Sequence, residues 1–428
     1  MFHKYLQLYK EHKIDLFFTH LLTLSIFLFI FSLPFNHILS KNILNQMFYF
    51  WVFSLQFVKI IEYFKTNTIF QLLSLFMLFI WISYLWSDPP LYYMNYINTS
   101  FKFWFLPLMI LLTSMKKEYL IHYINLFIFA MFINEIVSYG LFFGYFEDTL
   151  LGFKLTGSSY DPVPFQPSHM EYSVYISFTI FLLLYALFHQ KWNLKSFIYI
   201  FFALTMISNL FLSAGRSGQF TFLVTSVLLI FIYLKNSLKY IFISITFLVV
   251  TFISAYNLSS TFHTRVDAGV NDISKVFTSK NYGSSFGVRL SSYALLPEIF
   301  DTTPLLYGVG FNDTNRVIHK MHMGNFSQFP TFSHQEGHLH NTYITLYSAL
   351  GLSGLALFLY ILYLLLRLYF LNNYFNYLKY IFLFNIFFAG FTENFFRERE
   401  IMLLFATFVA ILLLAYKQEQ INTSLKES

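Results

Sequence analysis

The chain has 428 residues, of which 57% are hydrophobic and 11% are charged, against about 25% charged residues in an ordinary soluble domain. This composition excludes a soluble globular enzyme and a disordered chain, and the long apolar runs exclude a porin-like barrel. The net charge of +6 is spread over short polar stretches, so it indicates membrane topology and no nucleic-acid partner. The sequence predicts an all-α integral membrane protein.

Twelve apolar stretches are predicted to cross the membrane, since a spanning helix needs about 20 mostly apolar residues. The first ends at Pro34 and lacks a small-residue cleavage site, which favours an uncleaved span over a signal peptide. If either of the two short stretches, 101–114 and 378–391, fails to span, the topology after it inverts. The twelve are 16–33, 43–61, 69–86, 101–114, 119–144, 171–188, 196–213, 219–234, 239–256, 341–366, 378–391 and 400–416.

The distribution of basic residues sets the orientation. With a cytoplasmic N-terminus, fifteen lysines and arginines fall on the cytoplasmic side, and the opposite short loops hold six: Lys41, Lys102, Lys154, Arg216, Arg397 and Arg399. This asymmetry obeys the positive-inside rule. We therefore predict spans one to nine in residues 1–256, an external loop in 257–340, and spans ten to twelve with a cytoplasmic tail in 341–428.

The external loop is predicted to contain two helices. In the first, apolar residues recur at three- and four-residue steps and give the helix one apolar face: Phe262, Val266, Val270, Ile273 and Phe277. The second carries Val288, Ser292, Leu295 and Ile299 and is ended by the breaker Asp301-Thr-Thr-Pro304.

Six of the thirteen histidines lie in this loop: His263, His319, His322, His334, His338 and His340. A zinc site is disfavoured, because the chain has no cysteine, Glu336 is the nearest acidic residue, and the His-x-His spacing fits poorly. We expect no metal, and we expect His319 and His322 to be solvated loop residues.

His340 and Asn341 stand where the external loop re-enters the membrane. A neutral imidazole there could accept a proton from a hydroxyl, since its reference pKa of about 6.5 suits general-base work. Equally, the pair could be an interfacial histidine and an asparagine that caps the helix beginning at Thr342. The local sequence does not separate these two interpretations.

Arg216 lies in a tight external turn, Ser213-Ala-Gly-Arg-Ser-Gly-Gln219. Its guanidinium suits bidentate binding of phosphate oxygens, and the flanking glycines are expected to let a ligand approach the backbone. A snorkelling arginine that contacts lipid headgroups is the alternative, but the position runs against the positive-inside trend, which favours a functional role.

Other charged residues have open roles. Arg289 begins the second external helix, whereas Arg265, on the polar side of the first, is better explained as solvated. Arg397 and Arg399, in the turn 393–400, are expected to pair within that turn. Glu135 is costly in lipid and must face the interior, where it could serve a proton or substrate path or bind another helix.

Taken together, these residues resemble the O-antigen ligase and O-antigen polymerase superfamily of bacterial envelopes. His340-Asn341, nine residues and then Gly351-Leu-Ser-Gly354 are similar to the ligase pattern of His, a small polar residue, nine positions, Gly, two positions and Gly. The Arg216 turn resembles the family's arginine turn, and Arg289 followed by Pro304–Phe311 resembles its Arg…Pro-Leu-x-Gly-x-Gly stretch, although 304–307 is longer here. The motifs cover about 213–354.

The resemblance implies a metal- and cofactor-independent glycosyltransferase of the bacterial inner membrane, with its site facing the periplasm. It implies a donor glycan on undecaprenyl diphosphate, with Arg216 and Arg289 stabilising the diphosphate and His340 as the base. His338 would assist, and Arg265 and Asn341 join the candidate substrate-binding residues. The partners would be this donor, an acceptor and membrane lipid, and the absence of a phosphate-binding Gly-x-x-x-x-Gly-Lys loop fits a reaction driven by the donor itself.

A ligase uses lipid A–core as the acceptor, whereas a polymerase uses a second carrier-linked unit; the His-Asn-x9-Gly-x2-Gly spacing favours the ligase. A protein O-glycosyltransferase usually has a longer C-terminal external domain. A transporter or flippase would be expected to show repeated halves and an internal charge pathway, and the sequence has no evident repeat.

The topology can be tested with a reporter fused after Lys280. We expect activity from a reporter that works only outside the cytoplasm, because 257–340 is predicted to be external. Activity from a reporter that works only in the cytoplasm would refute the twelve-span layout.

Overall fold

The computed structural model describes residues 14–87, 95–147, 149–150, 152–166, 168–189, 194–333 and 338–427. The first half of the chain is helical apart from a short antiparallel strand pair, β1 (Thr149–Leu150) and β2 (Phe153–Lys154). Its helices are α2 (Ile14–Ser32), α3 (His37–Phe53), α4 (Lys59–Thr66), α5 (Thr68–Ile82), α6 (Asn95–Ser100), α7 (Leu106–Ser114), α8 (Leu120–Phe142), α9 (His169–His189), α10 (Leu194–Leu212), α11 (Arg216–Leu234) and α12 (Leu238–Leu258).

The second half contains the segment that is predicted to be external, here named the external segment, and the last long helices. Its elements are α13 (Ser260–Ser279), α14 (Ser285–Ala294), α15 (Leu296–Thr302), α16 (Thr314–Phe326), α17 (Pro330–Ser333), α18 (Thr342–Arg367), α19 (Asn373–Ala389) and α20 (Arg399–Glu427). Short 3-10 turns lie at Gln56–Val58, Ser83–Leu85 and Lys117–Tyr119, and Phe101–Phe105 forms a π-helical turn before α7.

The all-helical membrane architecture agrees with the sequence. Within the described ranges, seven helices are long and apolar enough to span a bilayer, and an eighth is added if one bent pair counts as a span. That pair, α3 with the segment Gln56–Thr66, is bent by 81°, so the predicted span 43–61 is not one straight helix. The twelve-span count stays a prediction.

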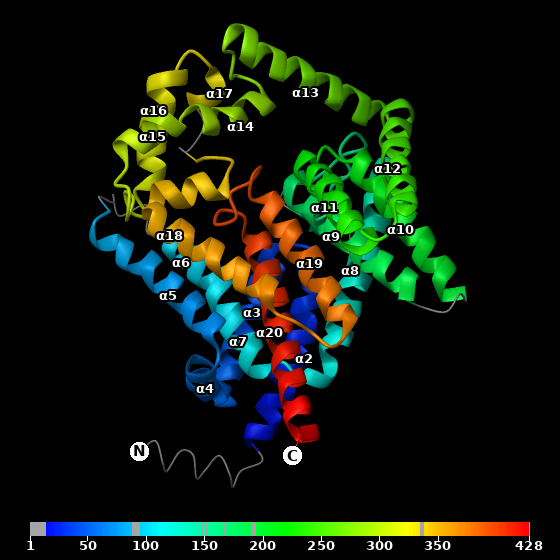
Figure 1. Ribbon diagram of the computed structural model, residues 1–428, viewed down its shortest axis with the longest axis vertical. Helices are drawn as coiled ribbons and strands as arrows, with labels where there is room; N and C mark the ends of the chain where they lie inside the picture. The colour runs from blue at the N-terminus through cyan, green and yellow to red at the C-terminus, as the bar shows by residue number, and fades with distance from the viewer. Residues whose placement is uncertain are drawn as a thin grey trace.

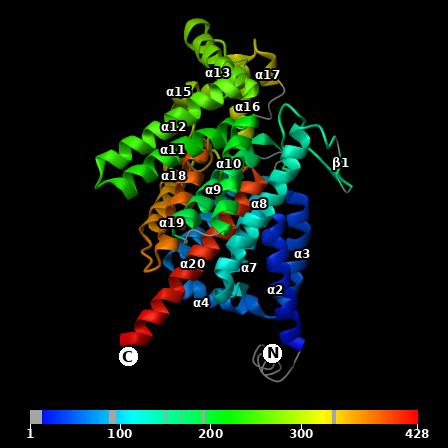
Figure 2. The ribbon, with the colours of Figure 1, turned by 90° about the vertical axis from the view of Figure 1, so that its right-hand side faces the viewer.

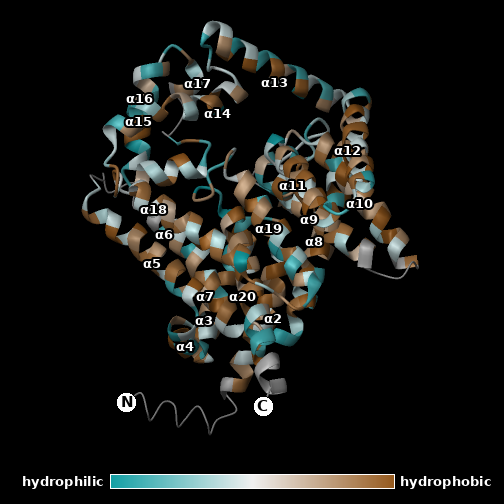
Figure 3. Ribbon diagram, in the orientation of Figure 1, coloured by the Kyte–Doolittle hydropathy of each residue, from teal (hydrophilic) through white to brown (hydrophobic). Residues whose placement is uncertain are grey.

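The long helices differ sharply in how much of each is covered by protein. In α20, 89% of the apolar window is buried, and the helix runs through the centre of the molecule, whereas the window of α12 at the edge is 0% buried. Most of α12 is coloured as apolar (Figure 3). A helix with mostly apolar side chains and no fully buried residue in its apolar window is suited to contact with lipid.

Helices α13–α17 form one end of the molecule (Figure 1), and α14–α17 have a core of their own. Helices α13–α17 lie at the end opposite the start of α2 and the end of α20 (Figures 1 and 2). Around α14–α17 lies a small separate core that includes Val288, Leu295, Ile299, Ile318 and Phe332. The external segment is therefore a folded unit with its own buried side chains.

The external helices partly match the sequence prediction. Helix α13 is present, but only part of its predicted apolar face is packed: Phe262 is buried, whereas Val270 is 64% and Phe277 79% exposed. The predicted second helix is two helices, α14 and α15, because Pro297 cannot continue the backbone hydrogen bonding of the first. Its four predicted face residues are all buried.

Helix α18 is interrupted at Gly351, where residues 304–311 form hydrogen bonds with its backbone. Gly351 adopts φ +66° and ψ −165°, a region that is essentially restricted to glycine. The exposed backbone groups pair with the Pro304–Phe311 loop: Val309 N donates to Ser348 O at 2.9 Å, and Leu352 N donates to Leu305 O at 2.8 Å. A Cβ at position 351 would lie 2.3 Å from the carbonyl carbon of Leu306. The break in α18 thus exposes backbone groups that residues 304–311 satisfy, and the close approach of this loop needs a glycine at position 351.

Replacing Gly351 tests this pairing between the 304–311 loop and the break in α18. We expect Gly351→Ala to destabilise the protein by at least about 1–3 kcal/mol, because alanine is strained in this conformation and its Cβ would meet the Leu306 backbone. The measurement is the unfolding temperature of the purified protein in detergent.

Gly269→Ala is the matched control. Gly269 lies within α13, and nothing is within 4 Å of a Cβ added there, so the substitution should be neutral or stabilising. Equal unfolding temperatures for the two variants would contradict the requirement for glycine at position 351.

Candidate functional site

The arginine turn is held by α9 and by Asp161, which precedes that helix in the sequence. Ala214 N donates to Asp161 Oδ1 at 2.8 Å, and Asp161 Oδ2 lies 3.1 Å from His169 Nδ1. Gly218 N donates to Ser173 Oγ at 3.0 Å, and a Cβ on Gly218 would lie 2.2 Å from the Ser173 backbone. The expectation that the glycines leave room for a ligand is therefore wrong, because α9 fills that space.

The Arg216 side chain points toward α13. Its Nη2 donates to the backbone oxygen of Arg265 at 3.3 Å, and its Nη1 lies 4.0 Å from Asp272 Oδ2. Nη1 is buried and has no hydrogen-bond partner. The structure brings Arg216 and Arg265 together through the Arg265 carbonyl, while the Arg265 side chain is exposed.

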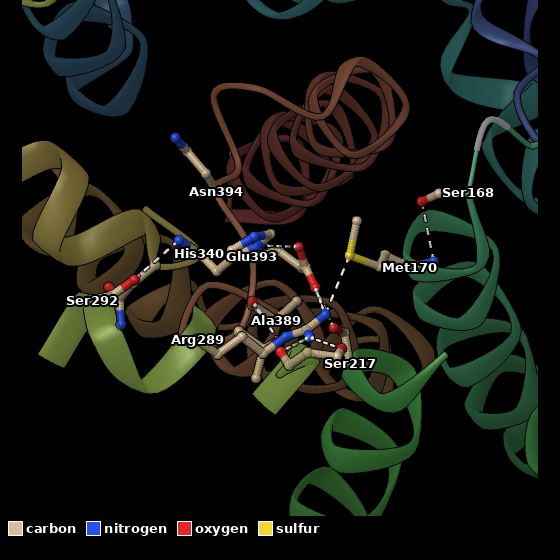
Figure 4. Close-up of polar contacts among 12 residues, drawn as sticks. Ser168, Met170, Ser217, Arg289, Ser292, His340, Ala389, Glu393 and Asn394 are labelled. Carbon is tan, nitrogen blue, oxygen red and sulfur yellow. Dashed lines mark hydrogen bonds and ion pairs between the residues drawn. The ribbon is translucent and has the colours of Figure 1, made fainter. Parts of the chain in front are cut away.

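Glu393, in the turn between α19 and α20, is the centre of the site (Figure 4). Its side chain is 2% exposed. Arg289 Nη2 donates to Oε1 at 3.2 Å, Ser217 Oγ donates to the same oxygen at 2.5 Å, and His340 Nδ1 lies 3.5 Å from Oε2. One carboxylate thus joins the start of α11, helix α14 and the segment before α18.

The electrostatics of Glu393 keep it ionised. Burial alone would raise its pKa, but the hydrogen bond from His340, the charge of Arg289 and the Ser217 hydroxyl hold the pKa below its usual range. An anion at this position favours the proton of a neutral His340 on Nδ1, which leaves the Nε2 lone pair free. The arrangement can therefore present a base.

The side chains of Arg289 and His340 have further fixed contacts. Arg289 Nη1 donates to Ser285 O at 3.0 Å, and Nη2 lies 3.4 Å from Met170 Sδ, but its Nε is buried without a partner. The backbone N of His340 donates to Ser292 Oγ at 3.3 Å. Helix α14 thus holds part of the Arg289 side chain and the backbone of His340.

His338 stacks edge-on against His340, with 4.8 Å between the ring centroids. Burial, followed by the charge of Arg397, lowers the pKa of His338 well below its usual range, so its imidazole is neutral. Its Nδ1 is buried without a partner, which leaves it able to meet a polar group of a ligand beside His340.

Asn341 caps α18. Its Oδ1 accepts from Tyr343 N and Ile344 N, both at 2.9 Å, and its Nδ2 donates to Tyr293 Oη at 2.9 Å. The capping interpretation is confirmed. Since both ends of the amide are occupied, Asn341 serves the site by fixing the start of α18 directly after His340.

The charged side chains of the turn 393–400, all within the described residues, form no ion pair with one another, contrary to the sequence prediction. Glu400 Oε1 lies 2.7 Å from His37 Nδ1, and Arg399 Nη1 lies 3.0 Å from His37 Nε2. Glu393 was missed as a site residue because its partners are more than 50 positions away. The sequence did offer one signal for Glu393: it is an acidic residue shortly after an apolar helix, in a chain with few acidic residues.

The remaining expectations have mixed outcomes. His322 is buried against Phe332, with ring centroids 5.0 Å apart, so its predicted solvation is wrong; His334 and Glu336 lie outside the described residues. Glu135 faces the interior as predicted, with Oε1 lacking a partner. In the part of the chain that is described, no three His, Asp or Glu side chains are grouped to hold a metal ion.

Comparison with known protein families shows which family part of the chain resembles. Residues 201–359 match the family model described as O-antigen ligase. The chain thus contains a region that is similar to the O-antigen ligase family. No curated protein gives a significant match. The O-antigen ligase region extends from α10 to the kinked part of α18 and contains Arg216, Arg289 and His340, which confirms the resemblance identified from the sequence motifs. Glu393 lies outside the matched residues.

A double-mutant cycle tests the Arg289–Glu393 pair. Each of Glu393→Gln and Arg289→Gln should destabilise by about 3–5 kcal/mol, because removing one partner leaves the other charge buried and uncompensated. The double variant should lose less than the sum, with a coupling of about 1–3 kcal/mol. Unfolding in detergent provides the measurement.

The exposed pair Lys417–Glu62, 2.8 Å apart, supplies the control cycle, where solvent screening should limit the coupling to below about 1 kcal/mol. Additive losses at Arg289 and Glu393 would show that the two side chains do not interact.

Proposed function

We propose that the protein is an O-antigen ligase that transfers polysaccharide from undecaprenyl diphosphate to lipid A–core at the periplasmic face of the inner membrane. The observation that carries the proposal is the joining of Arg289 and His340 by Glu393, next to the Arg216 turn. This arrangement supports the proposal of cationic groups for a diphosphate and a base for a hydroxyl around one centre, and residues 201–359 of the same chain match the O-antigen ligase family model.

The arginines suit the leaving group. Arg216 Nη1 and Arg289 Nε are buried without hydrogen-bond partners, whereas buried donors normally have them. The oxygens of a diphosphate would satisfy both donors with charge-assisted hydrogen bonds. The same contacts would stabilise the negative charge that develops on the diphosphate as it departs.

The transfer balances without a nucleotide. The acceptor oxygen forms a bond to the anomeric carbon of the donor while the bond from that carbon to the diphosphate oxygen breaks. The electron pair of the breaking bond leaves with the lipid diphosphate, and the acceptor proton passes to His340 Nε2. Glu393 stabilises the resulting imidazolium, and the free energy comes from cleavage of the glycosyl diphosphate.

The acceptor decides between ligase and polymerase, since both use the same donor end. The His-Asn-x9-Gly-x2-Gly spacing supports the ligase. The deciding experiment compares the surface polysaccharide of a deletion strain with that of its parent. Loss of capped lipopolysaccharide with accumulation of carrier-linked polymer supports the ligase, capping by single units means a polymerase, and an unchanged profile removes both.

Substitutions at Arg216 and His340 separate charge stabilisation from proton transfer. Arg216→Ala should lower the transfer rate by about 10²–10³ by analogy with loss of an oxyanion donor, and Arg216→Lys should recover part, because the charge survives without the bidentate fork. His340→Ala should cost about 10²–10⁴, and His340→Lys should be equally inactive, because an ammonium cannot accept a proton.

The measurement is transfer in purified membranes together with donor binding. Binding should weaken in Arg216→Ala and survive in His340→Ala. Near-normal transfer by His340→Ala would refute the base assignment and make His338 the next residue to test.

Chelation tests whether arginines or a metal ion neutralise the negative charge of the diphosphate. Transfer in purified membranes should persist in a strong chelator, because arginines neutralise the leaving group in the proposed reaction. Abolition by the chelator with rescue by a divalent ion would instead indicate metal-assisted transfer.

A further inference from the structure

A cavity of about 440 Å³ lies between the start of α5, the end of α18 and α20. These segments belong to the end of the molecule opposite α13–α17 (Figure 1), so the cavity is remote from the site around Glu393. It is lined by Thr66, Asn67, Thr68, Ile69, Tyr360, Leu364, Arg367, Leu368, Leu413, Tyr416 and Gln420.

The lining is amphipathic. Ile69, Leu364, Leu368 and Leu413 supply an apolar part, and hydroxyl and amide side chains, including those of Thr66 and Thr68, supply a polar part. Tyr360 and Tyr416 add side chains with an apolar ring and a polar tip, which are typical of the membrane–water interface. A ligand that fills this space needs both an apolar portion and a polar portion.

Arg367 gives the cavity a positive charge. Its side chain is exposed, its Nη1 lies 3.3 Å from Tyr363 Oη, and its guanidinium stands over the Tyr363 ring at 5.8 Å. Within the described residues no carboxylate is in ion-pair distance of Arg367. Glu419, on the neighbouring α20, accepts hydrogen bonds from Leu371 N and Asn372 N.

The surroundings add positive potential at the same end. Lys417 pairs with Glu62, and Lys59 and Lys117 lie within electrostatic range of both. Three lysines therefore share one carboxylate. Basic groups and pockets between helices at this level of a membrane attract anionic lipid headgroups.

We propose that this cavity binds one phospholipid with an anionic headgroup. Arg367 contacts the phosphate, the threonine hydroxyls contact the headgroup, and part of an acyl chain lies along Leu364 and Leu413. The bound lipid connects α5, α18 and α20, three helices from distant parts of the sequence. The apolar half of the lining favours a lipid over a soluble anion, and the proposal is independent of the transfer reaction.

Lipid addition to the purified full-length protein in detergent tests the proposal. Phosphatidylglycerol should raise the unfolding temperature, and zwitterionic phosphatidylcholine should have little effect. Arg367→Gln should bind phosphatidylglycerol about fivefold more weakly, the factor expected for loss of one basic contact near a lipid surface. Thr68→Trp, which fills the cavity from an exposed position, should weaken binding while Arg367 is kept.

Lys239→Gln is the matched control, because Lys239 is exposed at the start of α12 and does not line the cavity; its response should equal that of the unsubstituted protein. An unchanged response in Arg367→Gln, or equal stabilisation by the two lipids, overturns the proposal. Equal stabilisation by inorganic phosphate alone also overturns it and assigns the cavity to a free anion.

Discussion

The buried carboxylate of Glu393 is the interaction on which the rest of the candidate site depends. A charge removed from water is tolerated only if nearby charges and hydrogen bonds compensate for the lost hydration. Glu393 obtains this compensation from Ser217, Arg289 and His340, which belong to three separate segments. The need to satisfy one anion therefore fixes the start of α11, helix α14 and the residue before Asn341 relative to one another.

The position of Glu393 also defines the chemistry of its neighbours. Shared between a guanidinium and an imidazole, the carboxylate offsets part of the positive charge of Arg289 and orients the ring of His340. Arg289 keeps one unpartnered donor, and Arg216 lies next to Ser217 with another. In the proposed reaction, His340 would act as the base toward the hydroxyl of the acceptor, and the unsatisfied arginine donors would bind the anionic leaving group of the donor.

The joint between the external segment and α18 is a second constraint, made from backbone groups. A break in a helix within a membrane protein leaves amide and carbonyl groups that must find partners. The Pro304–Phe311 loop supplies them at Ser348, Ala349 and Leu352. This joint lies one helical segment away from His340, so it fixes the external segment, with Arg289, over the start of α18. The glycine at position 351 therefore serves the architecture of this joint.

The sequence alone determined the class of fold, the positions of most helices and three of the central residues, Arg216, Arg289 and His340. The fold class and the helix positions follow from apolar run length and charge asymmetry. Arg216 and His340 stood out by their places at predicted membrane boundaries, and Arg289 gained a role only through the family resemblance. Only the tertiary structure decided that Glu393 joins them, that α9 fills the space beside the Arg216 turn, and that His322 is buried. The break at Gly351 and the bend after α3 were equally invisible. Each of these depends on contacts between distant segments, and local periodicity carries no information about which distant partner satisfies a buried charge or an open backbone group.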